Sequence, residues 1–128
     1  MRRSRLIPLP AKPHKYGAKA VVIDGVRFAS TKEGRRYLEL RLLERVGAVT
    51  GLELQPRFQI DVCSPIGELV KVCTYVADFR YVLHSPGGLV AQVIEDVKGM
   101  RADNPSRRMY LLKKKMAEAQ YGIQIREV

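Results

Sequence analysis

Hydrophobic and polar residues alternate with two different periods along this chain, and the periods divide it into strands and helices. Two short apolar runs within residues 21–28 flank Asp24-Gly25, and an Asp-Gly pair in that setting predicts a tight β-hairpin. From Ser30 to about Val46, apolar residues recur every three or four positions, which predicts an amphipathic helix. Its core stripe is predicted to consist of Tyr37, Leu40 and Leu43, flanked by Leu38, Leu42 and Val46.

Three strands are predicted in the middle of the chain, over residues 54–62, 71–83 and 89–98. The second is the strongest prediction, because it is rich in Val, Thr, Tyr and Phe. Turn sequences containing Pro and Gly separate the three segments. The pattern therefore predicts three strands in succession along the chain.

A second helix is predicted to begin at Asn104-Pro105, a suitable N-cap and first-turn pair, and to run to about Gln120. A short last strand, residues 123–128, follows it. The helix is predicted to bury a face made of Met109, Leu112, Met116 and Ala119. The complete order is hairpin, helix, three strands, helix, strand, which predicts an α/β fold.

Length and charge limit the function. At 128 residues the chain fits one domain with a core of useful size, and its formal net charge of +10 predicts a polyanionic partner. No apolar run approaches the roughly 20 residues that span a bilayer, so no membrane partner is expected. The basic N-terminus lacks the apolar stretch of a secretory signal, and we expect a cytoplasmic protein.

Basic side chains gather in two segments. Residues 1–20 form a Pro-containing arm without any acidic residue, and residues 21–128 form the single folded domain. The basic residues of the arm are Arg2, Arg3, Arg5, Lys12, Lys15 and Lys19. Those of the second predicted helix are Arg107, Arg108, Lys113, Lys114 and Lys115. Both sets are candidates for contacts with DNA phosphates, and the alternative for both is a solvated surface that adds solubility.

Acidic residues suggest the chemistry. If the second and third strands form an antiparallel hairpin about Gly87, Asp78 lies opposite Asp96. Because side chains on a strand alternate between faces, Lys98 projects from the same face as Asp96. A register shifted by one residue would instead bring Glu95 opposite Asp78.

Two opposed carboxylates destabilise a sheet but bind hard cations, so the pair is a candidate site for Mg²⁺ or Mn²⁺. Such an ion would polarise a phosphodiester and activate water. The alternative is structural, with Asp78 and Asp96 paired to Arg80 and Lys98. Glu33 also has two interpretations: it is the acid of a capping box with Ser30, or a fourth member of the site.

These elements resemble, in order, the PD-(D/E)xK nuclease superfamily, which has the fold of restriction endonucleases, and small phage members related to Holliday junction resolvases. The resemblance covers about residues 16–128 and is carried by the acid-bearing helix in 28–33 (FASTKE), the strand segment 75–79 (YVADF) and the strand end 93–99 (VIEDVKG). It implies a restriction-endonuclease-like α/β core with a mixed sheet flanked by helices. Ala77 departs from the motif, which has proline there.

The resemblance further implies that Asp78 and Asp96 bind Mg²⁺ or Mn²⁺, with Glu95 as the rival ligand, that Lys98 is catalytic, and that Glu33 supports the site. The expected activity is a structure-specific DNA endonuclease that resolves four-way junctions by paired nicks, as a homodimer, in the host cytoplasm if phage-encoded. The alternatives are a less selective phage nickase or end-processing endonuclease, and a non-catalytic DNA-binding protein on the same fold.

Overall fold

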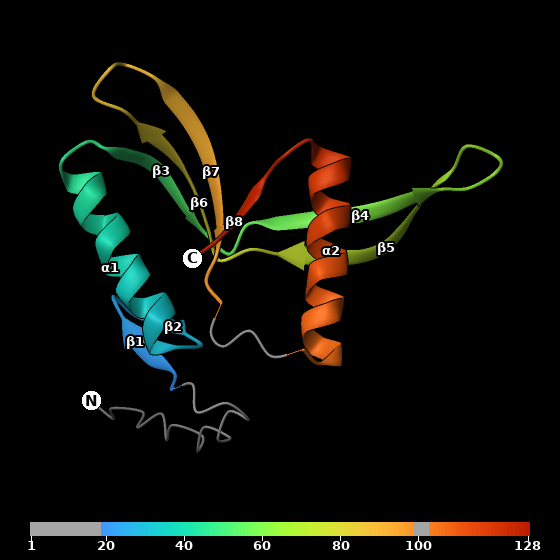
Figure 1. Ribbon diagram of the computed structural model, residues 1–128, viewed down its shortest axis with the longest axis horizontal. Helices are drawn as coiled ribbons and strands as arrows, with labels where there is room; N and C mark the ends of the chain where they lie inside the picture. The colour runs from blue at the N-terminus through green and yellow to red at the C-terminus, as the bar shows by residue number, and fades with distance from the viewer. Residues whose placement is uncertain (1–18, 99–102) are drawn as a thin grey trace, which may run out of the picture.

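The computed structural model describes residues 19–98 and 103–128, and Figure 1 shows how their elements are arranged. In chain order the elements are β1 (Val21–Ile23), β2 (Val26–Phe28), α1 (Thr31–Arg45), β3 (Val49–Leu54), β4 (Arg57–Cys63), β5 (Leu69–Val76), β6 (Phe79–His84), β7 (Val90–Asp96), α2 (Pro105–Tyr121) and β8 (Ile125–Glu127). The protein is thus α/β. No helix in the described residues is long and apolar enough to cross a bilayer.

The central sheet has four strands in the order β3-β6-β7-β8. It is mixed, because β3, β6 and β7 pair antiparallel while β7 and β8 pair parallel. Phe79 lies opposite Glu95, and His84 opposite Val90, so the predicted register of this hairpin about Gly87 is confirmed. The tight turn of the N-terminal hairpin at Asp24-Gly25 is confirmed as well, since Ile23 pairs with Val26.

The prediction of three middle strands was wrong, because the chain forms five strands there. Strand β3 was not expected, and a break at Gln55-Pro56 separates it from β4, which corresponds to the expected strand over 54–62. The expected strand over 71–83 is divided into β5 and β6 by a second break, at Ala77-Asp78. Gln55 has a positive φ of 51°, and Pro56 has no N–H to donate to a ladder. The two breaks are tied together, because the Gln55 N–H donates to the Asp78 carbonyl. The effect is to end the central sheet and start a separate two-stranded ribbon, β4–β5.

Helix α1 covers one face of the central sheet. Ser30 is its N-cap, as predicted, and the Ser30 hydroxyl accepts a hydrogen bond of 3.1 Å from the Glu33 N–H. Tyr37 and Leu40 are buried against Phe28 of the hairpin and against β3 and β6. The flanking apolar positions Leu38, Leu42 and Val46 are exposed instead. The hairpin and sheet therefore cover only the inner half of the predicted stripe.

Helix α2 lies on the other side, against the ribbon (Figure 1). It begins after the N-cap Asn104, whose side chain accepts from the Arg107 N–H, and ends at Gly122, which has a positive φ of 62°. The predicted buried face was wrong. Ala117 is the buried position, with Tyr110 and Met116 half-buried near it, whereas Met109, Leu112 and Ala119 are exposed. Aromatic contacts explain this rotation, since the Tyr110 ring packs on Tyr75 of the ribbon with centroids 6.3 Å apart.

Candidate metal centre

Asp78 and Asp96 lie at the point where the central sheet gives way to the ribbon. Asp78 occupies the break between β5 and β6, and Asp96 is the last residue of the neighbouring strand β7. The Asp78 backbone N–H donates to the Glu95 carbonyl at 3.0 Å, and its carboxylate Oδ2 accepts from the Val97 N–H at 2.7 Å. These bonds extend the strand pairing to the site and hold the Asp78 carboxylate beside the end of β7. The negative charge of Asp96 contributes to the raised pKa of the Asp78 carboxyl, so the two side chains interact electrostatically.

Asp96 is buried, with 2% of its surface exposed. By strand alternation its side chain lies on the same face as Ile94, which packs in one core cluster with Ala117 of α2. Oδ2 of its carboxylate accepts a hydrogen bond from the Tyr75 hydroxyl, and Oδ1 lies 2.8 Å from Nζ of Lys98. The same ammonium lies 3.9 Å from the centre of the Tyr110 ring, on α2. Lys98 and Asp96 therefore project from one face, as strand periodicity predicted.

Glu33 reaches the cluster from the first turn of α1. The Lys32 side chain donates to the Lys98 carbonyl at 2.6 Å, which fixes the start of α1 against the end of β7. Burial raises the pKa of the Glu33 carboxyl, and the charge of Asp96 adds to this effect, while a backbone hydrogen bond from Ala29 and the charge of Lys98 oppose it. Glu33 is therefore near enough to Asp96 and Lys98 to interact with both electrostatically. Its backbone N–H at the same time donates to the N-cap hydroxyl of Ser30.

Asp78 belongs to an acidic cluster whose negative charges are only partly neutralised. Burial raises the pKa of its carboxyl to about 8, and the negative charges of Glu33 and Asp96 contribute further, against the lowering effect of the Val97 hydrogen bond. Arg80, the alternative structural partner for Asp78, instead pairs with Glu53, its Nε lying 2.8 Å from that carboxylate. Three carboxylates and the Lys98 ammonium leave two negative charges in the cluster when all four groups are ionised.

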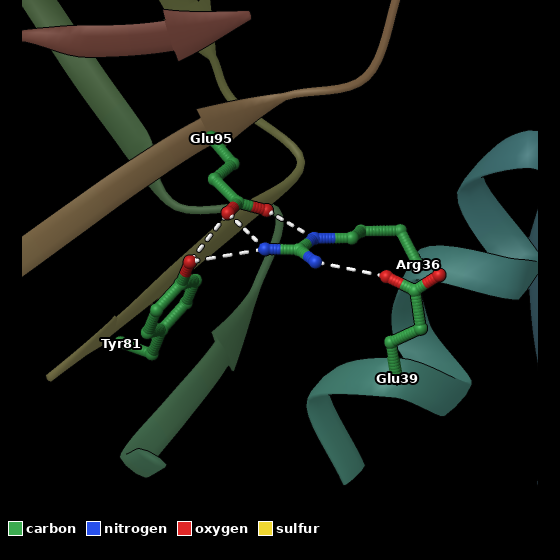
Figure 2. A network of polar contacts seen from close by, with 4 residues as sticks. All are labelled: Arg36, Glu39, Tyr81 and Glu95. Carbon is green, nitrogen blue, oxygen red and sulfur yellow. Dashed lines mark hydrogen bonds and ion pairs between the residues drawn. The ribbon is translucent and has the colours of Figure 1, made fainter. Parts of the chain in front are cut away.

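Glu95 points toward Arg36 of α1, as Figure 2 shows, and by strand alternation this is the face opposite to that of Asp96. Its carboxylate is fully buried and is held by Arg36 of α1 through two hydrogen bonds, of 2.8 Å from Nε and 2.5 Å from Nη2. The Tyr81 hydroxyl donates to the same carboxylate, and Arg36 also contacts the exposed Glu39 at 2.9 Å. The pKa of the Arg36 guanidinium is raised, chiefly by the hydrogen bonds to Glu95. Glu95 therefore ties α1 to β7 rather than facing Asp78.

Two of the basic residues of α2 form ion pairs with acidic side chains. Arg107 forms an ion pair with Glu127 of β8, with Nη1 and Oε1 3.0 Å apart, and Arg108 lies 3.4 Å from the exposed Asp103. Lys113 and Lys114 are half-buried and Lys115 is exposed. Lys19, the one described basic residue of the predicted arm, is exposed. The other basic arm positions, Arg2, Arg3, Arg5, Lys12 and Lys15, lie outside the described residues.

A cleft of about 590 Å³ opens next to the cluster, between the end of β5 and the first turns of α2. Tyr75 and Tyr110, which contact Asp96 and Lys98, form part of its wall. Lys113, from the middle of α2, also lines it, as does Pro105 of a first turn without acidic residues. The helix N-terminus and the lysine both favour negative charge in this cleft.

Sequence reasoning did not find three of the residues that shape the site. Tyr75 donates a hydrogen bond to Asp96, and the ring of Tyr110 contacts the Lys98 ammonium. Arg36 binds Glu95 on the other face of β7. Burial and the hydrogen bond to Asp96 both raise the pKa of the Tyr75 hydroxyl. Tyr75 stands three residues before Asp78 in a strand, and only its pairing with the buried Phe58 in the ribbon turns its hydroxyl toward Asp96. No local pattern in the sequence predicts that contact.

The donor set fits a hard divalent cation. In residues 19–98 and 103–128 the side chains form no ready-made group of three His, Cys, Asp or Glu ligands for a metal. Magnesium sites in proteins commonly use one or two carboxylates, with waters and substrate phosphates completing the octahedron. Asp78 and Asp96 supply two such oxygen ligands, and the surplus of two negative charges matches the charge of Mg²⁺ or Mn²⁺.

The chain belongs to a protein family described as "Protein of unknown function (DUF1064)", whose family model matches residues 13–127. That match covers all the described elements and the whole carboxylate cluster. No curated protein and no solved structure matches the chain.

Proposed function

We propose that this protein is a metal-dependent DNA endonuclease with a restriction-endonuclease-like core, in the manner of the PD-(D/E)xK superfamily. The observation that carries the proposal is the interaction of Asp78, at the break before β6, with Asp96, at the end of β7. Lys98 contacts Asp96, and Glu33 is close by. Burying like charges together is costly in a protein that has no use for them, and a bound cation removes that cost. The strongly basic composition adds a reason to expect a phosphodiester substrate.

Each residue of the cluster has a distinct proposed role. Asp78 and Asp96 would hold Mg²⁺ or Mn²⁺, and the bound ion would polarise the scissile phosphate and make a bound water more acidic. Glu95 is assigned no ligand role, because Arg36 occupies its carboxylate on the opposite face. Lys98 would orient the attacking water or offset negative charge that develops on the phosphate. Glu33 would accept a hydrogen bond from that water.

The proposed substrate is branched DNA, above all the four-way junction. Phosphate contacts from Lys113, Lys114, Lys115 and the N-terminal arm would position DNA without reading its sequence. Arg107 and Arg108 are the weaker candidates, because each already has an acidic partner. A junction has approximate two-fold symmetry, and the proposed cytoplasmic enzyme would match it as a homodimer with two metal sites.

Three substrates separate this proposal from its alternatives. A four-way junction, a nicked duplex and a linear duplex are incubated with the protein and Mg²⁺, and then with EDTA in place of the metal. The proposal predicts paired symmetric nicks in the junction alone, with no cutting in EDTA. Equal cutting of all three substrates would instead identify a less selective nickase or end-processing endonuclease.

Variants test whether the carboxylate cluster is responsible. Asp78→Asn should abolish cleavage while junction binding, followed by fluorescence anisotropy, is retained. Glu39→Gln is the matched control, because it removes an exposed carboxylate beside Arg36 and leaves the cluster intact. Junction binding without cutting by the wild type, unchanged in Asp78→Asn, would show a non-catalytic DNA-binding protein and refute the proposal.

A further inference from the structure

The β4–β5 ribbon continues beyond the body that supports it. Side chains of Phe58 and Ile60 face α2 and are buried. The register shift between Ile60 and Asp61 places its extra residue on β5, so β4 keeps its alternation and Val62 faces the same way as Ile60. On the partner strand, Tyr75 pairs with Phe58, and Val70 pairs with Val62. Val62 and Val70 are 54% and 51% exposed. One apolar face therefore runs the length of the ribbon, and only its inner half is covered.

Helix α2 ends at the point along the ribbon where the apolar face becomes exposed. Its last residues bond to the ribbon at the level of Gln59 and Asp61: the Tyr121 hydroxyl donates to the Gln59 carbonyl at 2.7 Å, and the Gln120 side chain accepts from the Asp61 N–H at 2.9 Å. Figure 1 shows the ribbon and its turn extending past the helix. The further exposed apolar side chains of this part of the ribbon are Ile66, Leu69 and Val72. We call residues 61–72 the ribbon end.

Charge identifies what kind of partner the ribbon end fits. Between residues 58 and 76 the only charged side chains are Asp61, Glu68 and Lys71, so this segment has two acids and one base in a chain of net charge +10. DNA is not the partner, because phosphate binding requires a surplus of cations. Two basic chains repel each other across most of their surfaces, but their ribbon ends can meet without that repulsion. A second copy of this chain is therefore the partner that the charge distribution favours.

We infer that two copies of this protein associate through their ribbon ends, each laying the apolar face around Val62 and Val70 on the same face of the other. An isolated two-stranded ribbon is only marginally stable in water, and packing face to face gives each ribbon end the second layer it lacks. The contact is isologous, because the same surface is used by both copies. This inference does not depend on the proposed nuclease activity.

The association is tested by sedimentation velocity over a range of protein concentrations. The wild type should sediment as a dimer that dissociates on dilution. The double variant Val62→Lys/Val70→Glu replaces two apolar side chains with a cross-strand ion pair, so β4 and β5 should remain hydrogen-bonded to each other. Charges buried in the centre of an interface are poorly tolerated, and we expect the dissociation constant to rise by about 30-fold or more.

A matched variant on another exposed apolar face is the control. Leu38→Glu/Leu42→Lys places an equivalent ion pair on the outer face of α1, at a helical spacing that tolerates it, and should remain a dimer. A second ribbon variant, Val62→Thr/Val70→Thr, keeps two β-branched side chains on the same face, removes only apolar surface, and should weaken the dimer in the same direction. Circular dichroism checks that each variant is folded. A monomeric wild type, or ribbon variants that dimerise as well as the wild type, would overturn the inference.

Discussion

Arg36 pairs with the buried Glu95 and with the exposed Glu39. Replacing Arg36 with Met is expected to destabilise the protein far more than replacing Glu39 with Gln. Arg36→Met leaves the Glu95 carboxylate, which is fully buried, with the Tyr81 hydroxyl as its remaining hydrogen-bond donor among the side-chain contacts of Figure 2. Losing one partner of a buried ion pair typically costs about 3–5 kcal/mol, and we expect about 3 kcal/mol because the Arg36 side chain is 23% exposed.

Urea denaturation followed by circular dichroism measures this change as a lower midpoint at an unchanged slope. For a protein of this size, 3 kcal/mol corresponds to a fall in melting temperature of roughly 10 °C. The control is Glu39→Gln, which removes the exposed partner of Arg36 and should cost less than about 0.5 kcal/mol.

A double variant separates loss of an interaction from loss of packing. In Arg36→Met/Glu95→Gln the buried charge is gone, and the amide oxygen introduced at position 95 still accepts from the Tyr81 hydroxyl. This variant should recover at least half of the stability lost in Arg36→Met. If Arg36→Met unfolded at the same urea concentration as Glu39→Gln, the pair would not be the tie between α1 and β7 that its geometry indicates.

Four further predictions concern the carboxylate cluster. Asp78→Asn should raise the melting temperature of the metal-free protein at pH 8, because it removes like-charge repulsion with Glu33 and Asp96; a lower melting temperature would count against an acidic cluster. The wild type without metal should lose stability between about pH 4 and pH 8, because folded Asp78, with its raised pKa, keeps a proton that the unfolded chain has released. A stability profile that is level over this pH range, and equal to that of Asp78→Asn, would contradict this. Added Mg²⁺ should stabilise the wild type more at pH 8 than at pH 6, since the ion competes with that proton, and scanning calorimetry at the two pH values measures the difference. Lys98→Ala should abolish junction cleavage but keep metal-dependent stabilisation, and loss of both would assign the lysine a structural role.

Local rules were enough to predict the helices and the key register. Ser30 and Asn104 cap their helices through side-chain bonds that the sequence indicates, and Asp24-Gly25 forms the turn expected of it. The register about Gly87 followed because a short turn leaves little choice of pairing. That register puts Asp78 beside the end of β7, so the acidic pair was predictable from the sequence.

Long-range contacts account for what could not be predicted. Residues 71–83 have an unbroken strand-like composition, and the break at Ala77-Asp78 arises from bonds to the chain at Gln55-Pro56, more than 20 residues away. Glu95 and Arg36 are 59 residues apart in sequence, and no periodicity links them. The buried face of α2 was mispredicted for a similar reason. Its orientation follows from aromatic rings on another element, whereas an apolar stripe in the sequence indicates only that some face could be buried.

The most direct measurement is a titration of the metal-free protein with Mn²⁺ at pH 8, with free Mn²⁺ followed by electron paramagnetic resonance. If the side chains of residues 78 and 96 form one cation site, the wild type and Glu39→Gln should bind Mn²⁺ equally, and Asp78→Asn and Asp96→Asn at least about tenfold more weakly. Equal binding by all four proteins, or binding by none, would contradict a metal centre at this position.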